Sequence, residues 1–93
     1  MNNVAVKDIT IDLQDKNAGD TDADRGDKIY WKNTTSNPIV LNPPSNVAPH
    51  NAETILAGAT GIKHTVNQNA NGASDYTFNV GAASSLRTGR IIV

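Results

Sequence analysis

Cysteine is absent from all 93 residues of the chain. The protein therefore forms no disulfide and offers no thiolate for an iron–sulfur cluster, a zinc site or nucleophilic catalysis. Charge is also scarce, because only 18% of the residues are charged and the net charge is −1. The eight basic residues are scattered along the chain. Binding to a phosphate backbone needs clustered lysine and arginine, so we expect no interaction with nucleic acid.

Long apolar runs are missing as well. No stretch approaches the roughly 20 apolar residues that a membrane-spanning helix requires, so we expect no membrane span. The first residues lack the basic and apolar regions of a signal peptide. This leaves a cytoplasmic protein or the mature part of a longer precursor. Our working hypothesis is an extracellular, periplasmic, viral or cell-surface assembly.

Short segments of alternating apolar and polar residues make up most of the chain, and turn-forming residues separate them. They predict about seven strands in one antiparallel β-sandwich with Greek-key connections, spanning residues 1–93 as a single domain. Residues 14–27 and 42–49 carry no such alternation and are expected to be loops. The expected strands are Val4–Leu13, Lys28–Asn33, Pro38–Leu41, Glu53–Ala57, Ile62–Val66, Tyr76–Val80 and Gly89–Val93.

Motifs in the middle and at the end of the chain resemble the cupredoxin family of small blue-copper proteins. Gly26-Asp27-x-Ile29-x-Trp31-x-Asn33 is similar to the family's GD-x-V-x-W/F-x-N strand, and a polar turn and a proline follow it. The final segments, Tyr76-x-Phe78-x-Val80 and Gly89-x-Ile91-x-Val93, are similar to the family's last two strands. The resemblance covers about residues 26–93 and implies a cupredoxin-like sandwich.

The resemblance also implies where copper ligands would lie. In copper-binding members a histidine follows the proline, where this chain has Ile39, and a cysteine follows the Y-x-F/Y-x pattern, where it has Val80. The next loop, Gly81–Thr88, contains neither the second histidine nor the methionine of the family. Type 1 copper needs a thiolate and two imidazoles. We therefore expect apolar packing in place of the copper site, no electron transfer and no cofactor.

Three carboxylates at alternate positions, Asp20, Asp22 and Asp24, raise the question of calcium, because calcium prefers several oxygen ligands. The EF-hand pattern does not fit, since it needs glycine at position six and glutamate at position twelve. Counted from Asp20, these positions hold Arg25 and Trp31. A looser calcium site formed by the three aspartates stays open, beside the alternative of a solvated acidic loop over residues 15–27.

The two histidines are too few for a zinc site, which needs at least three protein ligands. His50 follows a proline in an expected loop, and we interpret it as a surface residue. His64 lies on the apolar face of an expected strand, where a hydrogen-bonded, semi-buried side chain is typical.

Several short motifs have a structural interpretation beside a functional one. Arg25-Gly26-Asp27 spells an integrin-binding tripeptide, but its last two residues belong to the strand-entry motif. Asn33-Thr34-Thr35 is a glycosylation sequon in a eukaryotic secretory setting. We expect Trp31 in the core, and Tyr30, between two lysines, as the exposed aromatic that could stack on a sugar.

These observations predict a non-enzymatic, copper-free module with a structural or protein-interaction role, including self-assembly. The expected contact surface is the end where copper would lie, formed by the turn after Asn33, residues 42–50 and the loop Gly81–Thr88. The alternative is a calcium- or carbohydrate-binding module that uses the acidic loop 15–27 or Tyr30.

Overall fold

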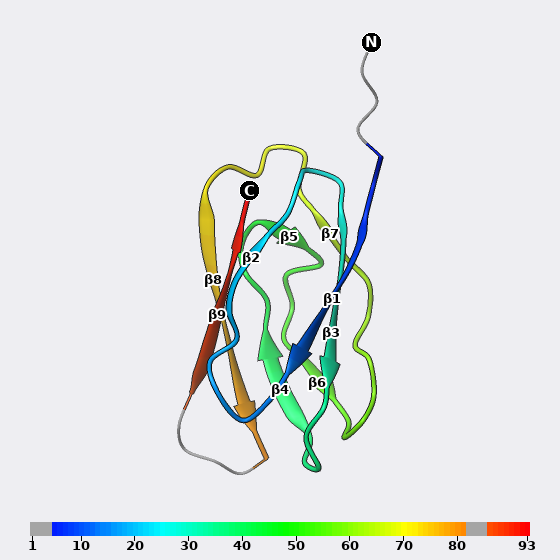
Figure 1. Cartoon of the computed structure of the whole chain (residues 1–93), viewed down its shortest axis with the longest axis vertical. Coiled ribbons are helices and arrows are strands. Elements are labelled where there is room, and N and C mark those ends of the chain that lie inside the picture. Colours follow the sequence, from blue (N-terminus) through cyan, green and yellow to red (C-terminus); the bar gives the residue numbers. More distant parts are fainter. Residues whose placement is uncertain (1–4, 82–85) are drawn as a thin grey trace.

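The computed structural model describes residues 5–81 and 86–93, and within them the fold is all-β with no helix (Figure 1). Nine strands form a four-stranded sheet, in the order β1-β3-β7-β5, and a five-stranded sheet, in the order β2-β9-β8-β4-β6. The strands are β1 (Asp8–Leu13), β2 (Gly19–Asp22), β3 (Lys28–Asn33), β4 (Ile39–Asn42), β5 (Val47–Ala48), β6 (Glu53–Ile55), β7 (His64–Val66), β8 (Ala73–Val80) and β9 (Arg87–Ile92).

The two sheets face one another across a single apolar core in a sandwich-like arrangement. Alternate residues of the longer strands are buried, as the two-residue period of a strand requires. Trp31 of β3 lies edge-on against Tyr76 of β8, with the ring centroids 5.2 Å apart. Both rings are almost fully buried, and Phe78 stacks beside Tyr76. The expectation that Trp31 belongs to the core is confirmed.

The sheets are mixed, so the expectation of a wholly antiparallel sandwich is wrong. β1 runs parallel to β3, and β2 runs parallel to β9. Both parallel strands come from the first quarter of the chain, which adds one edge strand to each sheet. Alternation of side chains is the same in parallel and antiparallel strands, so the pattern could not reveal the direction of pairing.

Two segments expected to be loops contain strands. Gly19–Asp22 forms β2, although its residues are polar, because it is an edge strand that pairs only with β9. Val47–Ala48 forms the short β5 against β7. The first strand begins at Asp8 rather than earlier, and Val4 lies outside the described residues. Ile62 precedes β7 and is 54% exposed, so it does not share the buried face of His64 and Val66.

Gly89 of β9 lies directly beneath the ring of Tyr76 of β8. It is the register partner of Tyr76, and the tyrosine ring covers its Cα. A Cβ atom at residue 89 would overlap the ring and its hydroxyl oxygen. The glycine therefore leaves room for the Tyr76 ring, which packs edge-on against Trp31 of the other sheet.

Candidate functional site

Ile39 and Val80 are direct cross-strand partners in the antiparallel pair of β4 and β8. Ile39 is fully buried and Val80 is 6% exposed. The two positions that the resemblance assigns to a copper histidine and cysteine therefore lie next to each other, and both are filled by aliphatic side chains. Neither side chain has a lone pair to give to a metal ion.

Asn33 holds the turns at this end of the sandwich together. Its side chain is fully buried, and its Nδ2 donates to the carbonyl oxygens of Asn37 and Ile55, at 2.7 and 2.9 Å. Its Oδ1 accepts from the backbone N–H and the hydroxyl of Thr35. Because the amide is buried and fully bonded, Asn33 is a structural residue and the sequon is not presented for glycosylation.

The segments that meet at this end differ in part from those expected. The turn after Asn33 does meet the end of β8, since Gly81 N donates to Pro38 O at 2.7 Å. Residues 42–50 run away from this end, because Asn42 pairs with Thr77 and Ser45 bonds to Ser74 further along β8 (Figure 1). Residues 56–59 take their place. Thr88 lies inside β9, and residues 82–85 of the predicted loop lie outside the described residues.

Three large aliphatic side chains are exposed near the same end, and we call this surface the aliphatic end. Val40 of β4 is 42% exposed and pairs with Thr54 and Asn79 on its two sides. Leu56 follows β6 and is 65% exposed. Leu86 directly precedes β9 and is 56% exposed. Exposed apolar side chains on neighbouring segments are candidates for an interaction site.

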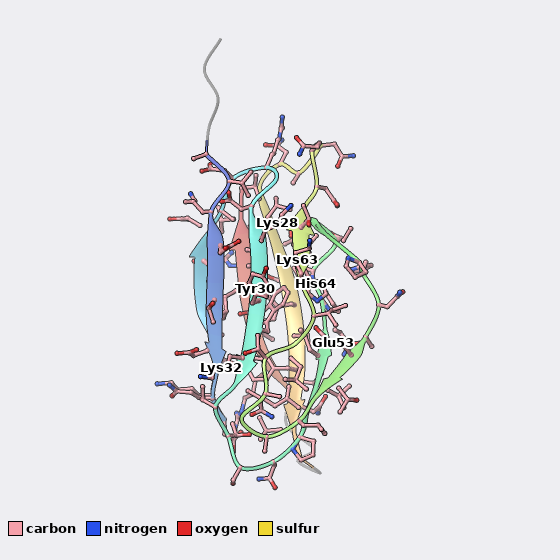
Figure 2. All side chains as sticks on the ribbon, turned by 90° about the vertical axis from the view of Figure 1, so that its right-hand side faces the viewer. Lys28, Tyr30, Lys32, Glu53, Lys63 and His64 are labelled. Carbon is pink, nitrogen blue, oxygen red and sulfur yellow. The ribbon has the colours of Figure 1, made fainter. Side chains whose placement is uncertain are left out.

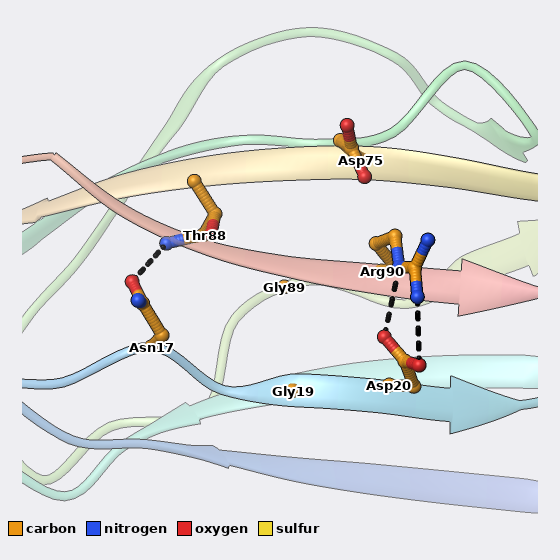
Figure 3. Close-up of a pocket in the computed structure, with 7 residues that line it drawn as sticks. All are labelled: Asn17, Gly19, Asp20, Asp75, Thr88, Gly89 and Arg90. Carbon is orange, nitrogen blue, oxygen red and sulfur yellow. Dashed lines mark hydrogen bonds and ion pairs between the residues drawn. The ribbon is translucent and has the colours of Figure 1, made fainter.

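The aspartates considered for calcium lie along an edge and bond to cationic side chains. The carboxylate of Asp20 forms a two-pronged ion pair with Arg90, both distances being 2.9 Å (Figure 3). The hydrogen bond from Arg90 lowers the pKa of Asp20 despite partial desolvation. Asp24 pairs with Lys7 at 2.9 Å, and Asp22 is exposed on β2. The calcium site stays a prediction, for which two of the three carboxylates already have partners.

Asp27 is buried, and its carboxylate ties three segments together. It accepts hydrogen bonds from the backbone N–H groups of Lys7 and Asp24, at 3.0 and 2.9 Å, and the Lys7 ammonium lies 3.4 Å away. Burial raises the pKa of Asp27, but these hydrogen bonds and the lysine charge together hold it below its usual value. With 1% exposure, Asp27 is not available to an integrin-type receptor.

The two histidines have different structural roles. His64 is fully buried, with Nδ1 donating to Pro49 O at 2.8 Å and Nε2 lying 2.9 Å from Glu53 Oε1. Its ring also lies edge-on to Trp31. His50 is an exposed loop residue that bonds to Pro44 O. Both interpretations from the sequence are confirmed, with His64 more deeply buried than expected.

A shallow pocket lies over the pair of β2 and β9 on the outer face of the five-stranded sheet (Figure 3). Gly19 and Gly89 are register partners at its floor. The ion pair of Asp20 and Arg90 forms one wall, and Asn17 accepts from Thr88 N at 3.0 Å at another. Arg90 holds the Asp20 carboxylate, and the carboxylate of Asp75 and the hydroxyl of Thr88 also line the pocket.

The described residues contain no group of three or more histidine, aspartate and glutamate side chains placed to hold a metal ion. No helix within residues 5–81 and 86–93 has the length and hydropathy needed to cross a bilayer. A scan against protein-family models and a search of curated proteins gave no match to this chain.

Sequence reasoning missed the residues that characterise these sites most clearly. Leu56 and Leu86 were not singled out, because an isolated leucine beside a turn carries no signal of exposure. Glu53 was not linked to His64, since the two residues are 11 positions apart on different strands. The role of Lys7 as a partner of two aspartates depends on the parallel pairing of β1, which the sequence pattern did not reveal.

Proposed function

We propose that the chain is a non-enzymatic, copper-free module of cupredoxin-like, Greek-key topology that contacts a protein partner through its aliphatic end. The observation that carries the proposal is the exposure of three aliphatic residues on segments that adjoin the buried pair of Ile39 and Val80. Val40 follows Ile39, Leu56 follows Ile55, and Leu86 precedes the pairing of β9 with β8. Apolar side chains occupy the positions of the implied copper ligands and continue onto the surface, a combination that suits binding rather than redox chemistry.

The network around Asn33 supports a role in recognition for this end. Turns held by buried hydrogen bonds lose little conformational entropy when a partner binds, so ordering them reduces the binding free energy only slightly. The Asn33 amide joins the turn at Asn37 to the end of β6 at Ile55, directly before Leu56. Loops on a rigid sandwich are common sites of binding.

Site-specific photocross-linking tests the contact surface. A photoreactive residue placed at position 56 or 86 should give the same cross-linked protein species in the cells that produce the chain. The matched control is position 6, because Val6 is also well exposed, at 58%, but lies near the start of β3 at the opposite end. Equal cross-linking from position 6, or none from positions 56 and 86, would contradict the proposal.

Metal-site engineering tests the cupredoxin-like part of the proposal separately. The double variant Ile39→His, Val80→Cys places one imidazole and one thiolate on register partners, and with free imidazole added as the second nitrogen ligand it should bind Cu(II) with an intense visible thiolate-to-copper charge-transfer band. The unaltered protein should give no such band, and Val80→Cys alone should give a weaker one. A double variant that folds but shows no band would remove the support for this topology.

A calcium- or carbohydrate-binding role is the alternative function. Two of the three aspartates considered for calcium are paired with Arg90 and Lys7, and Tyr30 is half-buried, which makes this role the weaker candidate. Thermal melting with millimolar calcium tests it, since a ligand that binds only the native state raises the midpoint. An unchanged midpoint would remove calcium from consideration.

A further inference from the structure

The outer face of the four-stranded sheet carries an ordered pattern of charge along β1 and β3. The parallel register pairs Asp8 with Lys28, Thr10 with Tyr30, and Asp12 with Lys32. All six side chains lie on the outer face, because the residues between them point into the core. One column therefore reads acid, hydroxyl, acid, and the neighbouring column reads base, aromatic, base. Figure 2 shows Lys28, Tyr30 and Lys32 spaced along β3 beside β1.

The charged residues of this face form no ion pair with another described residue of the chain. Lys7, Arg87 and Arg90 each form an ion pair with an aspartate. Among the described residues, no ion pair within 4.0 Å involves the two lysines and two aspartates of the β1–β3 face. They project to solvent, where a second molecule could contact them.

We propose that a second copy of the chain packs on this face in a two-fold symmetric dimer. The symmetry axis runs between β1 and β3, parallel to the strands. A rotation of 180° about that axis exchanges the two columns and keeps each residue at its own level. Asp8 then faces Lys28 of the second copy, Asp12 faces its Lys32, and Tyr30 faces its Thr10. The face is thus complementary to itself, as a two-fold contact requires.

The same arrangement covers the unpaired edge of β1. Lys28 N donates to Lys7 O, and Thr34 N donates to Leu13 O, so the odd-numbered residues of β1 bond to β3. The backbone groups of Asp8, Thr10 and Asp12 consequently point to the open edge. In the dimer, the segment before β7, which carries Lys63 and the exposed Ile62, lies over the edge of the second copy. Covering an edge in this way is a common protection against uncontrolled strand pairing.

The area of the face determines how strongly the two copies are expected to associate. A six-residue strand is about 20 Å long, and the face is two to three strands wide, or roughly 10–14 Å. The resulting area of roughly 200–280 Å² is smaller than the roughly 800 Å² that each partner buries in a standard interface. We therefore expect a weak dimer, populated at about 0.1–1 mM, whose association falls with added salt because its contacts are largely ionic.

Sedimentation velocity with complementary charge variants tests the dimer. An acidic variant, Lys28→Asp with Lys32→Asp, and a basic variant, Asp8→Lys with Asp12→Lys, should each be monomeric, because like charges then face each other. Mixed in equal amounts, they should form a heterodimer at or below the concentration at which the natural chain dimerises. If the acidic and basic side chains of this face interact only within one molecule, the mixed variants will not associate.

Matched single variants guard against indirect effects. Asp12→Lys should weaken dimerisation, whereas Asp22→Lys, the same change at an exposed position on the other sheet, should not. Circular dichroism and thermal melting establish that each variant is folded. A natural chain that stays monomeric at 1 mM, variants that dimerise unchanged, or a mixture that stays monomeric would each overturn the proposal. The proposal does not rest on the aliphatic end, which these substitutions leave intact.

Discussion

Replacing the buried carboxylate of Asp27 by an amide is the sharpest test of the folded structure. In the natural chain, Oδ1 accepts from Lys7 N and Oδ2 accepts from Asp24 N, so both oxygens are used. In Asp27→Asn one oxygen remains, and the amide NH₂ must face a backbone N–H that also donates. The substitution further removes the charge that the Lys7 ammonium approaches at 3.4 Å.

The expected loss follows from these contacts. A hydrogen bond to a charged group contributes about 1.5–3 kcal/mol, and a buried donor without an acceptor costs about 1–3 kcal/mol. We expect Asp27→Asn to lower the free energy of unfolding at pH 7 by about 2 kcal/mol. For a domain of this size, that corresponds to a fall of about 8–16 °C in the melting midpoint. Urea unfolding measures the free energy directly, with Asp22→Asn as the exposed control.

The pH dependence separates this reasoning from a general loss of packing. The pKa of Asp27 is lowered in the folded protein. Its contribution to stability is therefore present above the unfolded value of about 3.9, and it is lost as the pH falls through the folded value. The difference between the natural chain and Asp27→Asn should shrink below about pH 4. A difference that is equally large at pH 7 and pH 2.5, or absent at pH 7, would refute the role of the carboxylate.

Three further substitutions test other parts of the core by urea unfolding. Gly89→Ala should cost at least about 1–3 kcal/mol, since the new methyl group overlaps the Tyr76 ring; unchanged stability would contradict that packing. Asn33→Ala should cost about 1–3 kcal/mol, because the buried Ile55 carbonyl loses its Asn33 donor while Asn37 O keeps the Thr35 hydroxyl, and wild-type stability would exclude this network. His64→Leu should cost about 2–3 kcal/mol, because Pro49 O and Glu53 Oε1 both lose their partner while Glu53 Oε2 keeps Ile62 N, whereas His50→Leu, at an exposed site, should cost less than about 1 kcal/mol.

The strands of the central and C-terminal parts were predictable because their alternation reflects burial on one face. Trp31, Tyr76 and Phe78 are apolar, sit at even spacing and are buried, and each lies in a predicted strand. The expectation of apolar packing at Ile39 and Val80 came from the family resemblance, and both side chains are buried. Their pairing across β4 and β8 joins residues 41 positions apart, and the pattern within either strand does not reveal it.

The first quarter of the chain was predicted less well, for a physical reason. β2 is a four-residue edge strand whose side chains are almost all exposed, so no apolar pattern marks it. Its position depends on backbone hydrogen bonds to β9, about 70 residues later in the chain. Such pairing carries no local signal, and neither does the direction of pairing between β1 and β3. The residues at the aliphatic end were missed because loop conformation decides their exposure.

The acidic segment illustrates how one composition can serve purposes other than metal binding. Seven of the nine acidic residues lie between positions 8 and 27, a density that suggests an ion site. In the folded chain, Asp20 and Asp24 pair with cationic side chains, and Asp27 bonds to backbone N–H groups. β1 and β2 are also the edges of their sheets, where charged side chains oppose unwanted strand pairing. Asp8, Asp12 and Asp22 lie exposed on these edge strands. Because some of the acids bond within the chain and others keep foreign strands away from two open edges, their clustering in sequence has a structural explanation beside the calcium site that stays a prediction.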